Sequence, residues 1–154
     1  MNLEETREFF KADRFAAEVL GAVIEEAEDG FSRCTLAIRP EHRNAVGAVM
    51  GGAIFTLADF AFAVAANCGG GTMVSLNSQI TYLSPAKGET LIAAARRVRQ
   101  GRSTGYYRVE VSDEVGTQVA EVVTTGFVVK KIVRGTGKEG RHGRICSSAS
   151  AYGI

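Results

Sequence analysis

The sequence predicts a single α+β domain in which a curved antiparallel sheet wraps around one long helix. Its 154 residues, 45% of them hydrophobic, suit one sizeable core. Residues 51–67 are helix-forming and apolar on nearly all sides, so this helix should be buried over most of its surface. Two runs of strand composition precede it and four follow, and this segregated order is typical of α+β folds.

The segment before the long helix is expected to hold a short helix and a β-hairpin. Asn2 and Glu5 have the spacing of a capping box, which would start a helix that ends near Lys11. Residues 17–27 and 31–38 are alternating or β-branched-rich, and the Asp-Gly pair between them is a turn signal. Both runs are therefore predicted to be strands.

A polar loop over residues 40–50 leads into the long helix, and the Gly69–Gly71 triplet ends it. Four strands are then expected, over residues 73–83, 90–98, 104–112 and 118–129. Their short links predict an antiparallel meander. Residues 134–154 are rich in Gly and Ser and lack periodicity, so the domain should span residues 1–133 and be followed by a flexible tail.

The composition argues against several kinds of partner. Lys plus Arg number 18 and Asp plus Glu 17, so the net charge of +1 provides no basic surface for nucleic acid and no membrane anchor. The apolar helix is shorter than the roughly 20 residues that cross a bilayer, and the polar start lacks a secretory pattern. Cys34, Cys68 and Cys146 are odd in number and far apart, which favours buried thiols in a reducing cytoplasm. With His42 and His142 they offer no metal-ligand spacing.

Asp59 is the only ionisable residue of the long helix, and all its near neighbours are apolar. A carboxylate that loses water has a raised pKa and destabilises the fold unless it is paired or has a task. Two interpretations stay open. Asp59 lies on a narrow exposed stripe or is held by a neighbouring strand, or it is a general base or nucleophile in a dry cleft.

Gly51 and Gly52 open the helix where Ser, Thr or Asp would normally satisfy the free backbone N–H groups. Those N–H groups, at the positive end of the helix dipole, suit a polarised carbonyl or an oxyanion. The alternative is that the glycines only allow a tight entry into the helix. Asp59 lies roughly 12 Å along the axis from Gly51, so one helix cannot bring both groups to one carbonyl. If both act together, the site is shared between two chains, and the exposed sheet edge also predicts a homodimer.

The run NAVGAVMGGAIFTLADFAFAVAAN, residues 44–67, resembles the signature of PaaI-like (phenylacetate-degradation-type) hotdog thioesterases. The segments ITYLSPAKGE, GRSTGYYRVEVSD and VAEVVTTGFV are similar to strand segments of that family in the same order. The resemblance covers about residues 15–130. It implies the hotdog fold, an assembly of two chains or of two such dimers, and hydrolysis of an acyl- or arylacyl-CoA thioester. Coenzyme A would enter with the substrate, and no separate cofactor is implied.

The resemblance assigns catalytic roles to four positions. Asn44 and the Gly51 N–H match the groups that polarise the thioester carbonyl, and Asp59 matches the acid that activates water or attacks the acyl carbon. Ser75 matches a strand hydroxyl that orients water in some members. Substrate contacts are expected at Met50, Gly52, Phe62, Arg102 and Ser103, the last two where relatives contact the nucleotide of CoA.

One departure from the family pattern is Met50, which replaces the histidine before the two glycines. A thioether is a poor hydrogen-bond partner, so activity should be weak or the substrate unusual. His42 could compensate, although a lone loop histidine is more often solvated. A non-catalytic acyl-CoA-binding protein therefore stays the alternative function. A hotdog dehydratase would need a histidine beside the helix, and none is present there.

Two motifs that formally match catalytic patterns are set aside. GRSTG, residues 101–105, is followed by strand composition instead of the helix that a nucleophile elbow needs. GTGKEG, residues 135–140, lacks the surrounding βαβ unit of a dinucleotide site.

Overall fold

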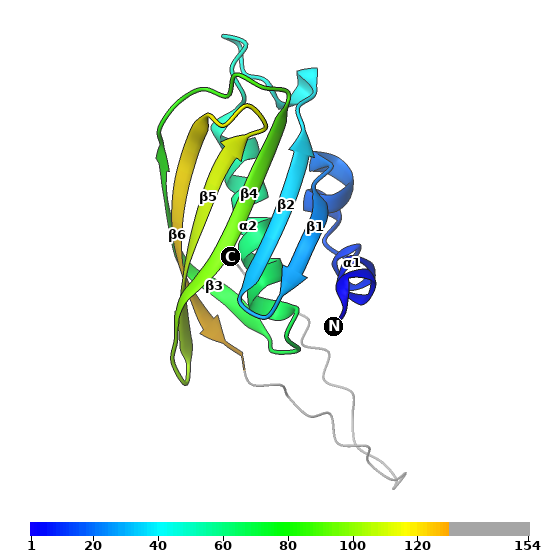
Figure 1. Ribbon diagram of the computed structural model, residues 1–154, viewed down its shortest axis with the longest axis vertical. Coiled ribbons are helices and arrows are strands. Elements are labelled where there is room, and N and C mark those ends of the chain that lie inside the picture. Colours follow the sequence, from blue (N-terminus) through cyan, green and yellow to red (C-terminus); the bar gives the residue numbers. More distant parts are fainter. Residues whose placement is uncertain (130–154) are drawn as a thin grey trace, which may run out of the picture.

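The computed structural model describes residues 1–129, which form one sheet curved around one long helix (Figure 1). The helical elements are α1 (Leu3–Phe10), the π-helix η1 (Phe15–Leu20), the short 3₁₀ helix η2 (Pro40–His42) and α2 (Gly51–Asn67). The strands are β1 (Val23–Glu28), β2 (Phe31–Ala37), β3 (Met73–Tyr82), β4 (Thr90–Gln100), β5 (Thr104–Asp113) and β6 (Gln118–Val128). The expected tail and Cys146 lie outside the described residues.

All neighbouring strands pair antiparallel, in the order β1-β2-β4-β5-β6-β3. The predicted fold class is confirmed, but the four-stranded meander is only partly right. Strands β4 to β6 are successive neighbours, whereas β3 pairs with β6 at the far edge and β4 pairs with β2. The amide of Asn67 bonds both the N–H and the carbonyl of Met73, at 2.7 and 3.2 Å, and so fixes where β3 leaves α2. The connection from β3 to β4 then crosses one end of the helix (Figure 1).

The expected strand over residues 17–27 is wrong in its first part. Residues 15–20 form the π-helix η1, and Gly21, at a φ of 88°, ends it before β1 begins at Val23. In the helical form the buried side chains of Ala16 and Leu20 come to the same face of the segment, which packs on α2. The other N-terminal predictions are confirmed, because α1 has both bonds of the capping box and the hairpin turns at Gly30 with a φ of 82°.

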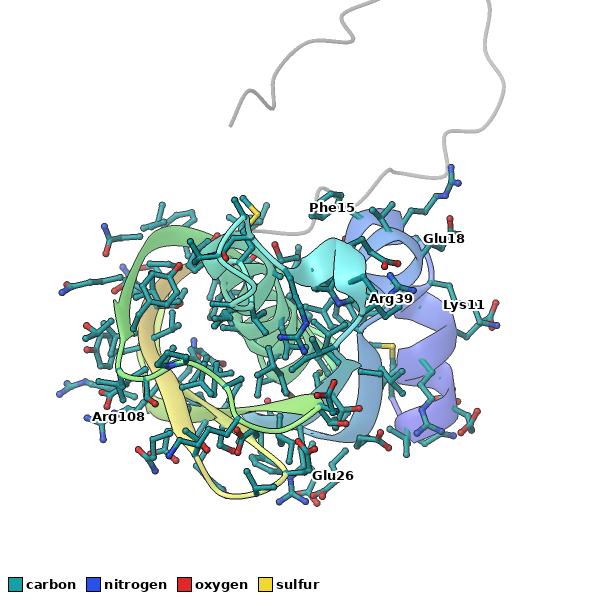
Figure 2. All side chains as sticks on the ribbon, turned by 90° about the horizontal axis from the view of Figure 1, so that it is seen from above. Lys11, Phe15, Glu18, Glu26, Arg39 and Arg108 are labelled. Carbon is teal, nitrogen blue, oxygen red and sulfur yellow. The ribbon has the colours of Figure 1, made fainter. Side chains whose placement is uncertain are left out.

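The long helix α2 begins and ends at the predicted residues. The concave face of the sheet buries most of it, and Leu57, Ala61 and Val64 are fully buried in that core. The side turned away from the sheet includes the partly exposed positions of Thr56, Asp59 and Ala63, spaced as one face of a helix. Figure 2, seen along the helix, shows α1 and η1 beside α2, with Phe15 of η1 near its open side. Side chains of α2 can therefore be reached from outside only on this open side and at the ends of the helix.

Candidate active site

Asp59 lies in a pocket between α2 and η1. The pocket is lined by Asp13, Phe15, Ala16, Phe55, Thr56, Asp59 and Phe60. Loss of water raises the pKa of the Asp59 carboxyl, and the negative charge of Asp13 raises it further. Within residues 1–129 no side chain or backbone group donates a hydrogen bond to it, so no strand holds it in place. A half-buried, unpaired carboxylate with a raised pKa is typical of general bases, although it does not by itself establish one.

The N-terminus of α2 presents two free backbone donors. Met50 is the N-cap residue in extended conformation, and its side chain makes no capping bond. Its carbonyl accepts from Ala53 and Ile54 at 3.0 and 3.2 Å, whereas the N–H groups of Gly51 and Gly52 have no acceptor among the described residues. They point out of the positive end of the helix, which is the geometry that binds a developing oxyanion.

Neither glycine is required by its backbone conformation, because neither has a positive φ. A Cβ on Gly51 would lie 2.7 Å from the hydroxyl oxygen of Tyr82, so a neighbouring side chain requires this glycine. A Cβ on Gly52 would meet only the Cε of Met50, at 4.0 Å. The space in front of Gly52 is open, as it must be where a ligand approaches the backbone. The simple alternative of a tight entry turn therefore does not explain the pair.

Asn44 lies in the exposed loop between η2 and α2. Its Oδ1 accepts from the N–H groups of Val46 and Ala48, each at 3.1 Å, and its own backbone N–H donates to the Ala48 carbonyl at 2.8 Å. Because the oxygen is the acceptor, the amide orientation is fixed, and Nδ2 has no acceptor within the described chain. The loop thus holds the amide with its NH₂ group free to donate.

His42 is buried, 5% exposed, so the expectation that it is solvated is wrong. Its Nδ1 accepts from the Arg39 backbone N–H at 3.0 Å, and its carbonyl accepts from the Met50 N–H at 2.8 Å. The turn of η2 brings the ring back onto Arg39, so His42 stabilises the loop, and it lines the same pocket as Met50 and Gly52. Met50 itself is 56% exposed and borders an apolar pocket with Phe15 and Val19.

The remaining predicted residues lie apart from this centre. Ser75 is exposed on the edge strand β3. Phe62 is only 2% exposed and packs edge-to-face on Tyr107, so in this chain it belongs to the core and not to an open cleft wall. Arg102 and Ser103 lie in the exposed β4–β5 turn, at the opposite end of the molecule from the start of α2 (Figure 1).

Sequence reasoning missed two neighbours of the site. Asp13 faces Asp59 across the pocket, and Tyr82 donates its hydroxyl proton to the Gly51 carbonyl at 3.0 Å. Both come from other elements of the chain, and neither residue belongs to a local motif that would reveal the contact.

Comparison with known proteins identifies the family. Residues 46–120 match the family model of the thioesterase superfamily. The acyl-coenzyme A thioesterase PaaI of Escherichia coli is 35% identical over 68% of this chain and 75% of its own length. The chain belongs to the thioesterase superfamily. The solved E. coli PaaI structure superposes with a TM-score of 0.77 at 28% identity, over 82% of this chain and 93% of that one. A hypothetical thioesterase protein of Streptococcus pneumoniae, solved with coenzyme A, superposes with a TM-score of 0.72 at 29% identity, over 78% of this chain and 96% of that one.

The expected family and fold are thus confirmed: this is a PaaI-like thioesterase with the hotdog fold, a thioester hydrolase. No helix in residues 1–129 is long and apolar enough to cross a membrane. In the same residues no three His, Cys, Asp or Glu side chains gather as a metal site. Cys34 and Cys68 are free and buried, as predicted, and burial raises the pKa of the Cys34 thiol to about 12.

Proposed function

We propose that this thioesterase hydrolyses an acyl- or arylacyl-CoA thioester to the free acid and CoA, with Asp59 as the group that drives attack on the carbonyl. The observation that carries this proposal is the carboxylate of Asp59, half-buried in a pocket with a raised pKa and without a hydrogen-bond partner in the described chain. Two relatives support the substrate class. One is named an acyl-CoA thioesterase, and the other was solved with coenzyme A.

The thioester carbonyl would be bound by the free N–H of Gly51 and by Nδ2 of Asn44. As a general base, Asp59 takes a proton from water while the water oxygen attacks the acyl carbon, and hydrogen bonds from the two donors stabilise the negative charge on the carbonyl oxygen. The tetrahedral intermediate collapses, the carbon–sulfur bond breaks, and the proton returns to the CoA thiolate. As a nucleophile, Asp59 would instead attack the acyl carbon, break the carbon–sulfur bond and release the CoA thiolate, and water would then cleave the acyl anhydride to the free acid and the Asp59 carboxylate.

The site is proposed to lie between two chains. Gly51 and Asp59 are eight residues apart on one straight helix, roughly 12 Å along its axis. The edge strand β3 leaves Val74 and Leu76 exposed, and such an apolar edge favours pairing with a second copy. In the proposed homodimer, Gly51 and Asn44 of one chain act with Asp59 of the other. A pair of such dimers, the CoA contacts of Arg102 and Ser103, the role of Ser75 and a cytoplasmic location stay predictions.

Replacing Asp59 with Asn tests the assignment. The amide keeps the size of the side chain but cannot accept a proton, so kcat should fall about 10²- to 10⁴-fold while KM for an acyl-CoA changes little. Free thiol release over a panel of acyl- and arylacyl-CoA substrates is the readout. The control is Glu110→Gln on the outer face of β5, which should match the wild type. Unchanged hydrolysis by the Asp59 variant would refute the proposed role.

A second candidate function is non-catalytic acyl-CoA binding, which Met50 favours because it replaces the family histidine. Binding of acyl-CoA to the wild-type protein without any thiol release, for every substrate of the panel, would establish this alternative.

A further inference from the structure

Tyr82 links the edge of the sheet to the start of α2. It is the last residue of β3, and its hydroxyl donates to the Gly51 carbonyl at 3.0 Å across 31 residues of sequence. The backbone behind it is held firmly, because the next N–H, of Leu83, donates to the Val119 carbonyl at 2.9 Å. The tyrosine thus reaches from a paired strand to the first turn of the helix.

The ring and Gly51 fit each other closely. A Cβ on Gly51 would come within 2.7 Å of the Tyr82 hydroxyl oxygen and 2.9 Å of its Cζ, so the ring would have to move to admit a larger residue. Because Gly51 has no positive φ, the reason for glycine is the approach of Tyr82 and not the backbone conformation.

The bond to the Gly51 carbonyl acts on the peptide that carries the Gly52 N–H. A peptide unit is planar, so fixing the direction of its C=O also fixes the direction of its N–H. A carbonyl has two lone pairs, so it can accept the hydroxyl in addition to its bond within the helix. Each bond accepted by the carbonyl also polarises the unit and makes its N–H a better donor. The Gly51 N–H is oriented and polarised in the same way, because the carbonyl of its peptide unit belongs to Met50 and accepts two hydrogen bonds.

We propose that Tyr82 is a positioning residue of the oxyanion site, which holds the Gly51–Gly52 peptide so that the N–H groups of both glycines point at the thioester oxygen. This rests on the proposed function, and it adds the Gly52 N–H as a second backbone donor. The oxygen gains negative charge only during attack. If the two N–H groups lose their orientation, the transition state is therefore destabilised more than the bound substrate.

Tyr82→Phe is the first test, because it keeps the ring against Gly51 and removes only the hydroxyl. Its kcat should fall about 3- to 10-fold with KM within about twofold of the wild type, as expected for one neutral hydrogen bond felt mainly in the transition state. The matched control is Tyr106→Phe on the outer face of β5, a tyrosine of similar exposure that should leave kcat unchanged. A kcat of Tyr82→Phe within about twofold of the control overturns the proposal.

A double-mutant cycle tests the contact without using activity. Gly51→Ala should lower the unfolding midpoint more in the wild-type background than in the Tyr82→Ala background, where the clashing ring is gone. Equal effects in both backgrounds would overturn the close fit. Asp59→Asn separates this inference from the proposed function. If that variant is inactive and Tyr82→Phe is normal, only the role of Tyr82 fails, whereas a fully active Asp59→Asn refutes the proposed function itself.

Discussion

The raised pKa of Asp59 has a consequence for stability that is independent of any activity assay. An acid whose pKa is higher in the folded chain than in the unfolded chain destabilises the fold at pH values above the folded pKa. The destabilisation is absent below the ordinary value of 3.8, because the group is then protonated in both states. Asp59→Asn removes the charge and keeps the shape. It should therefore stabilise the protein at neutral pH and have no such effect in acid.

The size of this gain follows from the environment of Asp59. Burying a polar group without a partner costs about 1 to 3 kcal/mol, and Asp59 is only half-buried, so the low end applies. The variant should be more stable by about 1 kcal/mol at pH 7.5, which is a rise of about 3 to 5 °C in Tm for a domain of this size.

Urea unfolding at pH 3.0, 5.0 and 7.5, at one fixed protein concentration, measures the gain. We expect the difference between variant and wild type to grow with pH, while the exposed control Glu110→Gln shows no trend. A variant that is less stable than the wild type at pH 7.5, or whose advantage is just as large at pH 3.0, would refute the reasoning. The first result would mean that the carboxylate is paired, and the second that the gain has nothing to do with ionisation.

Two further predictions concern the neighbours of the reacting groups. Asp13→Asn removes the negative charge that helps to raise the pKa of Asp59, so the acidic limb of the kcat/KM profile should move to lower pH, and an unmoved limb would exclude the interaction. Gly52→Ala meets only the Cε of Met50 at 4.0 Å and replaces glycine in a helix, so Tm should stay level or rise. Its kcat/KM should nevertheless fall at least about tenfold because the methyl group occupies the proposed path of the thioester. Wild-type turnover would mean that substrate does not approach there.

The helix α2 could be predicted to its end residues because its signals are local. A continuous apolar stretch, two glycines at its start and a glycine triplet after its end all lie within the segment itself. The segment before Gly21 had no such support, since a short apolar run suits a strand or a helix equally well. The burial of Ala16 and Leu20 against α2, a tertiary effect, decides for the helical form there.

Strand pairing and the surroundings of the site could not be predicted from local pattern. Turn composition marks where β3 and β4 end, but it does not show that β3 pairs with β6. Some residues proposed at the site can be recognised from the sequence, and others only from the fold. Asp59 stands out by its isolation on an apolar helix, and Asn44 only by family resemblance. Asp13 and Tyr82 act through contacts that form when distant segments meet, so they are visible only in the fold.

The arrangement of α2 suggests why the proposed site needs two chains. The sheet covers one side of the helix so completely that reactive groups can lie only on the open side or at the ends. The free N–H donors must lie at the N-terminus, because every later N–H in the helix is bonded. A carboxylate needs partial burial to raise its pKa, and near the middle of the helix η1 and the core provide that burial. The two requirements place the free N–H groups and the Asp59 carboxylate on different turns of the same helix. A second copy of the chain is the simplest way to bring both to one carbonyl.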